Sequence, residues 1–443
     1  MGGDGPGEVP EPGVPATAEA AGAMACLPGV SVGVEEEFLL VDPVSGECVP
    51  AAGPVLAGAG VHRFRHAGGS FQPELLSSQV EAATGVCREL EGLGAQLRYG
   101  RARLAEGARA AGARLAASGT PVLCRAAPPP ARGERFPTTL RAYGDVVEDY
   151  QACGCHVHVG VAGRDTAVAV VNHLRPWLPV LLALSANSPF DHVRAHAGDH
   201  PRRCGGGCGG GAGFASRRLV SMARFPGAGI PPWSASAAEH DRRVAALVEA
   251  GVLVDEAMTF WLARPSPRWP TVEVRVADAA ATAGEAVLHA ALVRGLVATA
   301  LADLAAGREA PPVDAQMCTA ALWAAGRNAM AGPAVDPLTG RAAPPWRLVD
   351  DLVARIAPAL EDTGDLGRVF TLVERVRRTG TGADRQRRAA AGTGGARGVV
   401  DMLVGQTCAD LPPAADDEPG ADGDEPGVPV VERGGGPVAP EQP

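Results

Sequence analysis

Apolar and polar residues alternate along four short, valine-rich segments of this 443-residue chain. They are residues 31–41, 78–84, 154–161 and 270–278. Successive side chains of a β-strand point to opposite faces, so strict alternation predicts strands with one buried and one polar face. We therefore expect four strands of one sheet.

Longer segments carry apolar residues three and four positions apart, which predicts amphipathic helices. These segments are 88–117, 166–186, 236–262, 283–307, 315–330, 346–361 and 366–379. The last ones follow each other closely, so the C-terminal third is expected to be mostly helical. Strands joined by irregular connections favour an α+β fold over a repeated βαβ winding.

The two ends of the chain have a different composition from its middle. Residues 1–28 are rich in Gly, Pro and Ala, and residues 409–443 are acidic and rich in Pro and Gly. Neither buries enough apolar surface to offset the entropy lost on ordering. We expect two disordered tails around a single domain over 29–408, with an atypical Gly-rich loop at 191–213.

The polar faces of the four strands carry side chains with catalytic chemistry. The pairs that share a face are Glu35 with Glu37, Gln79 with Glu81, His156 with His158, and Glu273 with Arg275. A solvated outer face of an antiparallel sheet is the ordinary alternative for each strand alone. If the faces instead look into one cleft, the carboxylates repel each other unless cations lie among them. Carboxylate oxygens suit Mg²⁺, and Arg275 would clamp a phosphate or carboxylate.

Charge and composition exclude several classes of function. The net charge of −10 argues against a nucleic-acid partner. All the basic residues are Arg, so a lysine-dependent phosphate loop is excluded. The apolar stretch 167–187 contains Asn172, His173 and Arg175, which predicts a core helix and no membrane partner. Ten cysteines without a signal peptide indicate reduced thiols in the cytoplasm.

Two cysteine–histidine patterns offer a zinc alternative. Cys153 and Cys155 alternate with His156 and His158, so one regular strand cannot direct all four to one ion. The second pattern spaces its residues by four along a segment broken by Pro201 and several glycines. Its members are His192, His196, His200, Cys204 and Cys208. A low-complexity insertion is the favoured interpretation of this second pattern.

Several motifs, in order, resemble a known family. They include "GVEEEFLLVDPVSG", "ELLSSQVEAATGVC", "CGCHVHVGV", "RPWLPVLLALSANSPF", "ARFPGAGIPPW", "RPSPRWPTVEVRVADAAAT" and "GTGADRQR". Over residues 30–408 the chain resembles carboxylate-amine ligases of the glutamate–cysteine ligase type 2 family. The resemblance implies a glutamine-synthetase-like fold, in which a curved antiparallel sheet lines the active site and helices pack outside. It also implies ATP-dependent formation of γ-glutamylcysteine through a γ-glutamyl phosphate.

The resemblance also assigns roles to the polar residues. Glu37 and Arg275 are the expected catalytic residues, and His156, His158, Arg275 and Arg387 the expected ATP-binding residues. The expected Mg²⁺ ligands are Glu35, Glu37, Glu74, Glu81 and Glu273. Asp278 is a weaker candidate. The expected partners are glutamate and cysteine or another amine, and a homodimer is compatible with the resemblance.

The chain departs from the family pattern after "SANSPF". The family continues with a stretch such as "HGRDTGYASWR", whereas this chain runs through glycines and returns as "GFASRRLVSM". Phe214 stands where the family has Tyr, and Arg217 where it has Trp. Two alternatives to a glutamate–cysteine ligase therefore remain: a ligase for another amine, or a catalytically silent homologue that binds nucleotide.

Overall fold

The computed structural model describes residues 28–60, 68–124, 128–131, 135–148, 150–192, 213–409 and 411. The predicted tails and most of the predicted loop 191–213 lie outside these residues. Four members of the second cysteine–histidine pattern, His196, His200, Cys204 and Cys208, lie outside them too.

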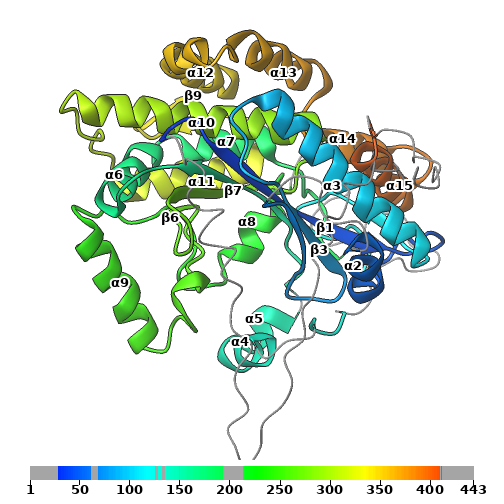
Figure 1. Ribbon diagram of the computed structural model, residues 1–443. Coiled ribbons are helices and arrows are strands. Elements are labelled where there is room, and N and C mark those ends of the chain that lie inside the picture. Colours follow the sequence, from blue (N-terminus) through cyan, green and yellow to red (C-terminus); the bar gives the residue numbers. More distant parts are fainter. Residues whose placement is uncertain are drawn as a thin grey trace, which may run out of the picture.

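A seven-stranded sheet forms the centre of the described fold (Figure 1). Its strands are β1 (Val32–Val41), β2 (Ser70–Pro73), β3 (Gln79–Ala83), β4 (Arg114–Ala116), β5 (Gly154–Gly160), β6 (Ala263–Pro265) and β7 (Thr271–Asp278). The order is β2-β3-β1-β5-β7-β6, with β4 also pairing with β1. These pairings are all antiparallel. A separate hairpin joins β8 (Ala334–Asp336) to β9 (Arg341–Ala343).

Helices surround the sheet. They are α2 (Ala52–Gly60), α3 (Leu90–Ala110), α4 (Arg135–Tyr143), α5 (Asp145–Glu148), α6 (Arg164–Leu174), α7 (Leu178–Ser185), α8 (Arg217–Met222), α9 (Ala237–Glu249), α10 (Ala283–Ala305), α11 (Ala315–Asn328), α12 (Pro345–Asp362), α13 (Leu366–Thr379), α14 (Gly382–Ala391) and α15 (Gly395–Thr407). Helix α10 packs on β1 and β5, and α12 and α13 cover α10 from outside (Figure 1). Helices α4 and α9 lie on the other side of the sheet.

The main core lies between the sheet and α10. The valines on the apolar faces of β1, β5 and β7 pack there against α3, α6, α7 and α10. Helix α10 is long and apolar enough to cross a membrane, but 72% of its apolar window is buried within the fold. It is therefore a core helix that covers the apolar face of the sheet. The polar side chains of the strands lie on the opposite face.

All four predicted strands are confirmed within two residues, and the helix predictions need three corrections. The helix predicted over 88–117 ends at Ala110, because Gly112 has a positive φ of 72° and the chain then enters β4. The helix predicted over 166–186 is two helices bent by 66°, with Pro176 at the break. The helix predicted over 236–262 ends at Glu249, before Gly251 at φ 70°.

Candidate functional site

The polar faces of β1, β3, β5 and β7 line one cavity of about 410 Å³. The predicted residues that it brings together are Glu35, Glu37, Glu74, Glu81, His156, His158, Glu273 and Arg275. Strand alternation and pairing account for this. Each strand turns its valines to the core, and adjacent strands bring their polar pairs into register. The solvated-face alternative is therefore replaced by a cavity.

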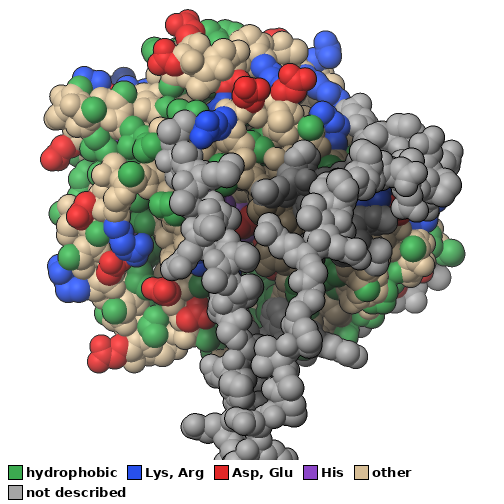
Figure 2. Space-filling view, viewed as in Figure 1, with side chains coloured by type: hydrophobic (Ala, Val, Ile, Leu, Met, Phe, Trp, Pro, Cys, Tyr) green, Lys and Arg blue, Asp and Glu red, His purple; other side chains and the backbone are tan. Residues whose placement is uncertain are grey.

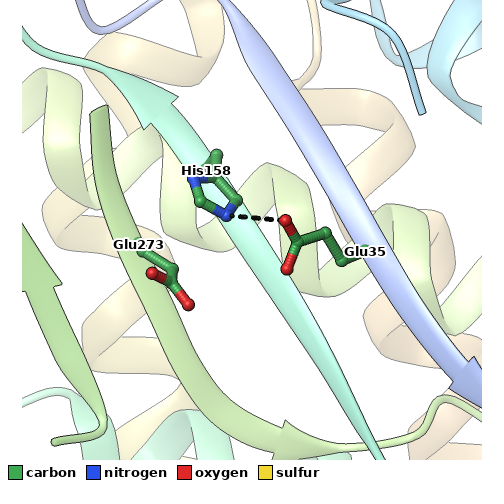
Figure 3. Close-up of side chains that lie close together, drawn as sticks. All are labelled: Glu35, His158 and Glu273. Atoms are coloured by element: carbon green, nitrogen blue, oxygen red, sulfur yellow. Dashed lines mark ion pairs between the residues drawn. The ribbon is translucent and has the colours of Figure 1, made fainter. Parts of the chain in front are cut away.

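One cluster of possible ligands is formed by Glu35, His158 and Glu273, which come from three adjacent strands and point toward one another (Figure 3). Their ligand atoms lie within 4.8 Å of one another. His158 Nε2 lies 3.3 Å from Glu35 Oε1. This nitrogen is buried and has no partner in hydrogen-bonding geometry, while Nδ1 lies 3.0 Å from Thr271 Oγ1. Nε2 is thus directed at the Glu35 carboxylate of the cluster.

The two carboxylates of this cluster are held in the ionised form. Burial would raise the pKa of Glu35, but the adjacent imidazoles of His156 and His158 outweigh it and hold the pKa far below its usual range. Burial likewise opposes ionisation of Glu273, yet the Arg275 and Arg264 guanidiniums keep its pKa well below the usual value. Arg264 Nε donates to Glu273 Oε2 at 2.8 Å, and Arg275 pairs with the other oxygen.

A second cluster contains only carboxylates: Glu37, Glu74 and Glu81. Glu37 lies directly opposite Glu81 in the β1–β3 register. No arginine forms an ion pair with any of the three in the described part of the chain; His156 Nε2, at 3.6 Å from Glu37 Oε1, is the nearest basic group. Burial and the neighbouring Glu37 raise the pKa of Glu74 to about 7, and burial and Glu74 raise the pKa of Glu81 well above its usual range.

The second cluster fits a divalent cation. Its carboxylates repel one another, which adds to burial in raising the pKa values of Glu74 and Glu81; Glu37 is partly compensated, by Arg218, Arg275 and the Gly154 N–H. Three carboxylates with ligand oxygens within 4.8 Å match the hard oxygen ligands that Mg²⁺ prefers. The first cluster fits a cation less strongly, because two arginines already pair with Glu273.

Arg218 is a cavity residue that the sequence interpretation missed. It lies in α8, whose N-cap Ser216 accepts a hydrogen bond from Leu219 N. Its side chain is buried, yet it has no ion pair with any carboxylate in the described part, and its Nε has no hydrogen-bond partner. Its Nη2 lies 3.4 Å from His156 Nε2 and 3.2 Å from the Arg275 carbonyl. A buried, unpaired guanidinium beside a cavity favours an anionic ligand.

Asp278 has a positioning role instead of lining the cavity. It accepts hydrogen bonds from Asn187 N at 2.8 Å, Ser188 Oγ at 2.7 Å and Ser216 Oγ at 2.8 Å. It therefore attaches the start of α8 to the end of β7 and so sets where Arg218 lies.

The pKa values of the two histidines shift in opposite directions, and Arg387 lies apart from them. Burial and Arg275 lower the pKa of His156 to about 4, so it is neutral at pH 7. Burial would lower the pKa of His158 as well, but Glu35 and Glu273 raise it above its usual value. Arg387, in α14, does not line the cavity and donates instead to the Gly213 carbonyl at 3.1 Å.

The middle glutamate of the run, Glu36, points into the core. Its carboxylate accepts from Arg101 Nε at 3.0 Å and from Nη2 at 2.6 Å, and both side chains are buried. Arg101 also donates to the backbone carbonyls of Ala280 and Thr407. The three consecutive carboxylates thus divide between two faces, with Glu36 neutralised by a buried arginine.

The zinc alternative at the first cysteine pattern is not supported by the geometry. Cys153 accepts a hydrogen bond from Gln79 Nε2 at 3.2 Å, whereas Cys155 packs in the main core beside Val157. The two thiols belong to different core clusters. Within the described residues, the clusters able to hold a metal are the two that line the cavity.

Residues 31–404 match the model of glutamate–cysteine ligase family 2. The chain belongs to this family of ligases. It is 52% identical over 379 residues to "Putative glutamate–cysteine ligase 2-2" of Saccharopolyspora erythraea, covering 86% of this chain and 93% of the relative. It is 43% identical over 385 residues to a relative of similar name from Salinispora arenicola, covering 86% and 96%.

Solved structures show the same fold at low sequence identity. Glutamate–cysteine ligase from Francisella tularensis in complex with AMP has a TM-score of 0.61 and 14% identity, covering 87% of this chain and 90% of that one. A bifunctional glutathione synthetase from Pasteurella multocida also has a TM-score of 0.61, covering 85% of this chain and 52% of that one. The predicted α+β, glutamine-synthetase-like fold is confirmed.

Proposed function

We propose that this family member is an ATP- and Mg²⁺-dependent carboxylate-amine ligase that joins the γ-carboxylate of glutamate to an amine, with cysteine as the first candidate. ATP would phosphorylate the γ-carboxylate, and the amine would displace phosphate from the γ-glutamyl phosphate. One observation supports this most: two clusters of possible metal ligands and four arginines, Arg218, Arg264, Arg268 and Arg275, line the same cavity.

The chemistry needs such a mixture of charges. A carboxylate is a poor electrophile, and its phosphorylation brings two anions together, so catalysis depends on positioning and charge neutralisation. In this proposal Glu37, Glu74 and Glu81 hold one cation, and Glu35, His158 and Glu273 hold another. Mg²⁺ held by these residues would supply positive charge to neutralise phosphate oxygens.

Arg218 and Arg275 are the proposed anion-binding residues. Glu273 fixes the Arg275 guanidinium, while the free Nε of Arg218 leaves that side chain available to a phosphate or a substrate carboxylate. Neutral His156 lies between Arg218 and Glu35, so it orients both without adding charge. Arg387 lines no part of this cavity, so its predicted nucleotide contact has no geometric support.

The amine is the open part of the proposal. Part of the cavity lining is aromatic: Tyr150, Phe225 and Phe260 are in mutual ring contact, and Trp269 also lines the cavity. These rings suit an apolar group, either the adenine ring or the side chain of an amine other than cysteine. Among the departures from the family pattern, Phe214 packs on Trp323 and Arg217 donates to the Pro189 carbonyl, both away from the cavity.

The test is ADP release from ATP with Mg²⁺, fixed glutamate and a panel of amines that includes cysteine. Release that requires glutamate and one amine supports the ligase and names the acceptor. The Glu37→Gln variant should lose release, while Glu361→Gln, an exposed change on α12, should not. Absence of release with every amine, in a folded protein that binds Mg-ATP, would contradict the proposal and favour the silent homologue.

Visible surface charge is consistent with small-molecule substrates. Figure 2 shows acidic and basic side chains interspersed over the visible face, without a broad basic patch among the described residues. A cytoplasmic location, a single domain over 29–408 and a homodimer remain proposals drawn from the sequence and the resemblance.

A further inference from the structure

Cys48 and Cys124 lie side by side outside the ligase cavity. A parallel bridge pairs Glu47 with Leu123, so the next residue of each segment is a cysteine at the same level. Paired segments run about 4.8 Å apart, which falls within the Cα separation of about 4.4–6.8 Å that a disulfide spans. The two thiols are hydrogen-bonded to each other, and both are reduced.

Two polar side chains contact the Cys124 sulfur, and a third contacts one of these two. Gln151 Nε2 lies 3.3 Å from Cys124 Sγ and 3.0 Å from His192 Nε2. His192 also hydrogen-bonds the Cys124 thiol, and its Nδ1 lies 2.5 Å from Asp191 Oδ1. A cysteine beside a histidine that is oriented by a carboxylate is the arrangement of an activated nucleophile.

This arrangement favours a thiolate. The hydrogen bond from Cys48 lowers the pKa of Cys124 to about 4; burial opposes this effect, and His192 and Gln151 add to it. Burial works against a charged His192, but hydrogen bonds to Asp191 and Cys124 raise its pKa to about 10. The same thiol–thiol hydrogen bond raises the pKa of Cys48, which stays protonated as the donor. These shifts favour a Cys124 thiolate beside a protonated His192.

We propose that Cys124 is a peroxide-reactive thiolate and that Cys48 is its resolving thiol. The Cys124 sulfur attacks one oxygen of hydrogen peroxide, the O–O bond breaks, and the leaving hydroxide takes the proton of His192 as water. The Cys48 sulfur then attacks the sulfenic acid on Cys124, the S–O bond breaks, and the hydroxide leaves as water with the Cys48 proton. Two thiols and one peroxide give one disulfide and two waters.

The site is distinct from the ligase chemistry but lies near it. Neither thiol lines the cavity. Gln151 also accepts a hydrogen bond from Ser78 Oγ at 3.0 Å, and Ser78 directly precedes β3, which carries Glu81. Cys124 itself is buried, and the partly exposed side chains of His192 and Asp191, at 28% and 25%, give the proposed route for a small peroxide.

The experiment treats the native protein with hydrogen peroxide, blocks the remaining thiols with iodoacetamide and maps peptides without reductant. Trypsin alone leaves Cys26 and Cys48 in one peptide, so a glutamate-specific protease is added to cut after Glu47. The expected product is a Cys48–Cys124 peptide pair lighter by two hydrogens, which a thiol reductant separates. In Cys48→Ser, dimedone should instead label a sulfenic acid on Cys124.

A second measurement tests the activation directly. At pH 6 an ordinary thiol is less than about 1% thiolate, so Cys124 should be alkylated at least about tenfold faster than a thiol of ordinary pKa. Cys408 is the control: it is more exposed than Cys124, and burial raises the pKa of its thiol, so it is not activated. His192→Gln should remove the advantage. Alkylation of Cys124 no faster than that of Cys408, or a disulfide joining any other pair, would overturn the proposal.

Discussion

The acidic cluster of the cavity leads to a quantitative prediction: without Mg²⁺, Glu74→Gln should make the protein more stable. The pKa of Glu74 is raised from 4.5 to about 7, first by burial and then by Glu37. At about 1.4 kcal/mol per factor of ten in proton affinity, ionised Glu74 lowers the free energy of unfolding by up to about 3 kcal/mol at pH 8. Glu74 is only partly buried, and solvent screening reduces this to about 1–3 kcal/mol.

The pH dependence of stability shows that ionisation of Glu74 is destabilising. An unfolded chain releases the Glu74 proton near pH 4.5 and the folded protein releases it near pH 7, so the folded protein binds more protons between these values. Its stability therefore falls as pH rises through this window. The advantage of Glu74→Gln should be below about 1 kcal/mol at pH 5 and reach its full value above pH 7.

Thermal unfolding in EDTA at pH 5 and pH 8 measures this. At pH 8 the midpoint of Glu74→Gln should exceed that of the wild type by roughly 1–4 °C, given about 2 cal/mol/K of unfolding entropy per residue. Adding Mg²⁺ should raise the wild-type midpoint more than that of the variant. Glu361→Gln, exposed on α12, is the matched control. A metal-free Glu74→Gln that is less stable than the wild type at pH 8 would refute the electrostatic reasoning.

Three further substitutions test other contacts. Arg218→Gln removes the guanidinium that has no carboxylate partner in the cavity. The kcat/KM for ADP release should fall at least about 100-fold, while the circular dichroism spectrum stays unchanged. A loss below about tenfold would exclude an anion-binding role. Arg101→Met leaves the Glu36 carboxylate buried and unpaired, so urea unfolding should show a loss of about 3–5 kcal/mol, partly recovered by adding Glu36→Gln. Arg387→Ala should leave the KM for ATP within about twofold of the wild-type value, because Arg387 contacts the Gly213 carbonyl and not the cavity. A large rise in KM would support the nucleotide-binding role that the resemblance implies.

The face on which each strand residue lies is predictable from sequence, because the alternation of side chains has a period of two. Alternation alone therefore separates Glu35 and Glu37 from Glu36. That the four polar faces meet in one cavity depends on strand order, which local pattern does not determine. The partner of Glu36 also lies beyond local pattern, since Arg101 is 65 residues away in a helix.

Other parts of the site give too little local signal. Strand β6 has three residues, too few to show alternation, so the sequence does not mark Arg264 as a cavity residue. Helix α8 has six residues, and Arg218 follows the stretch in which the chain departs from its family. The resemblance alone assigns Arg387 to the nucleotide, without a pattern that places its side chain, and the fold directs it to Gly213.

The buried arginine behind the acidic strand has a consequence for biosynthesis. Arg101 joins Glu36 near the beginning of the chain to the carbonyl of Thr407, which is 306 residues further along than the arginine itself. During translation the Arg101–Glu36 pair therefore emerges long before the helix that completes its surroundings. Until α15 leaves the ribosome, this ion pair lacks one of the groups that satisfy and bury it in the folded protein. Chains that stop before α15 should consequently be cleared by proteolysis rather than accumulate as shortened enzymes.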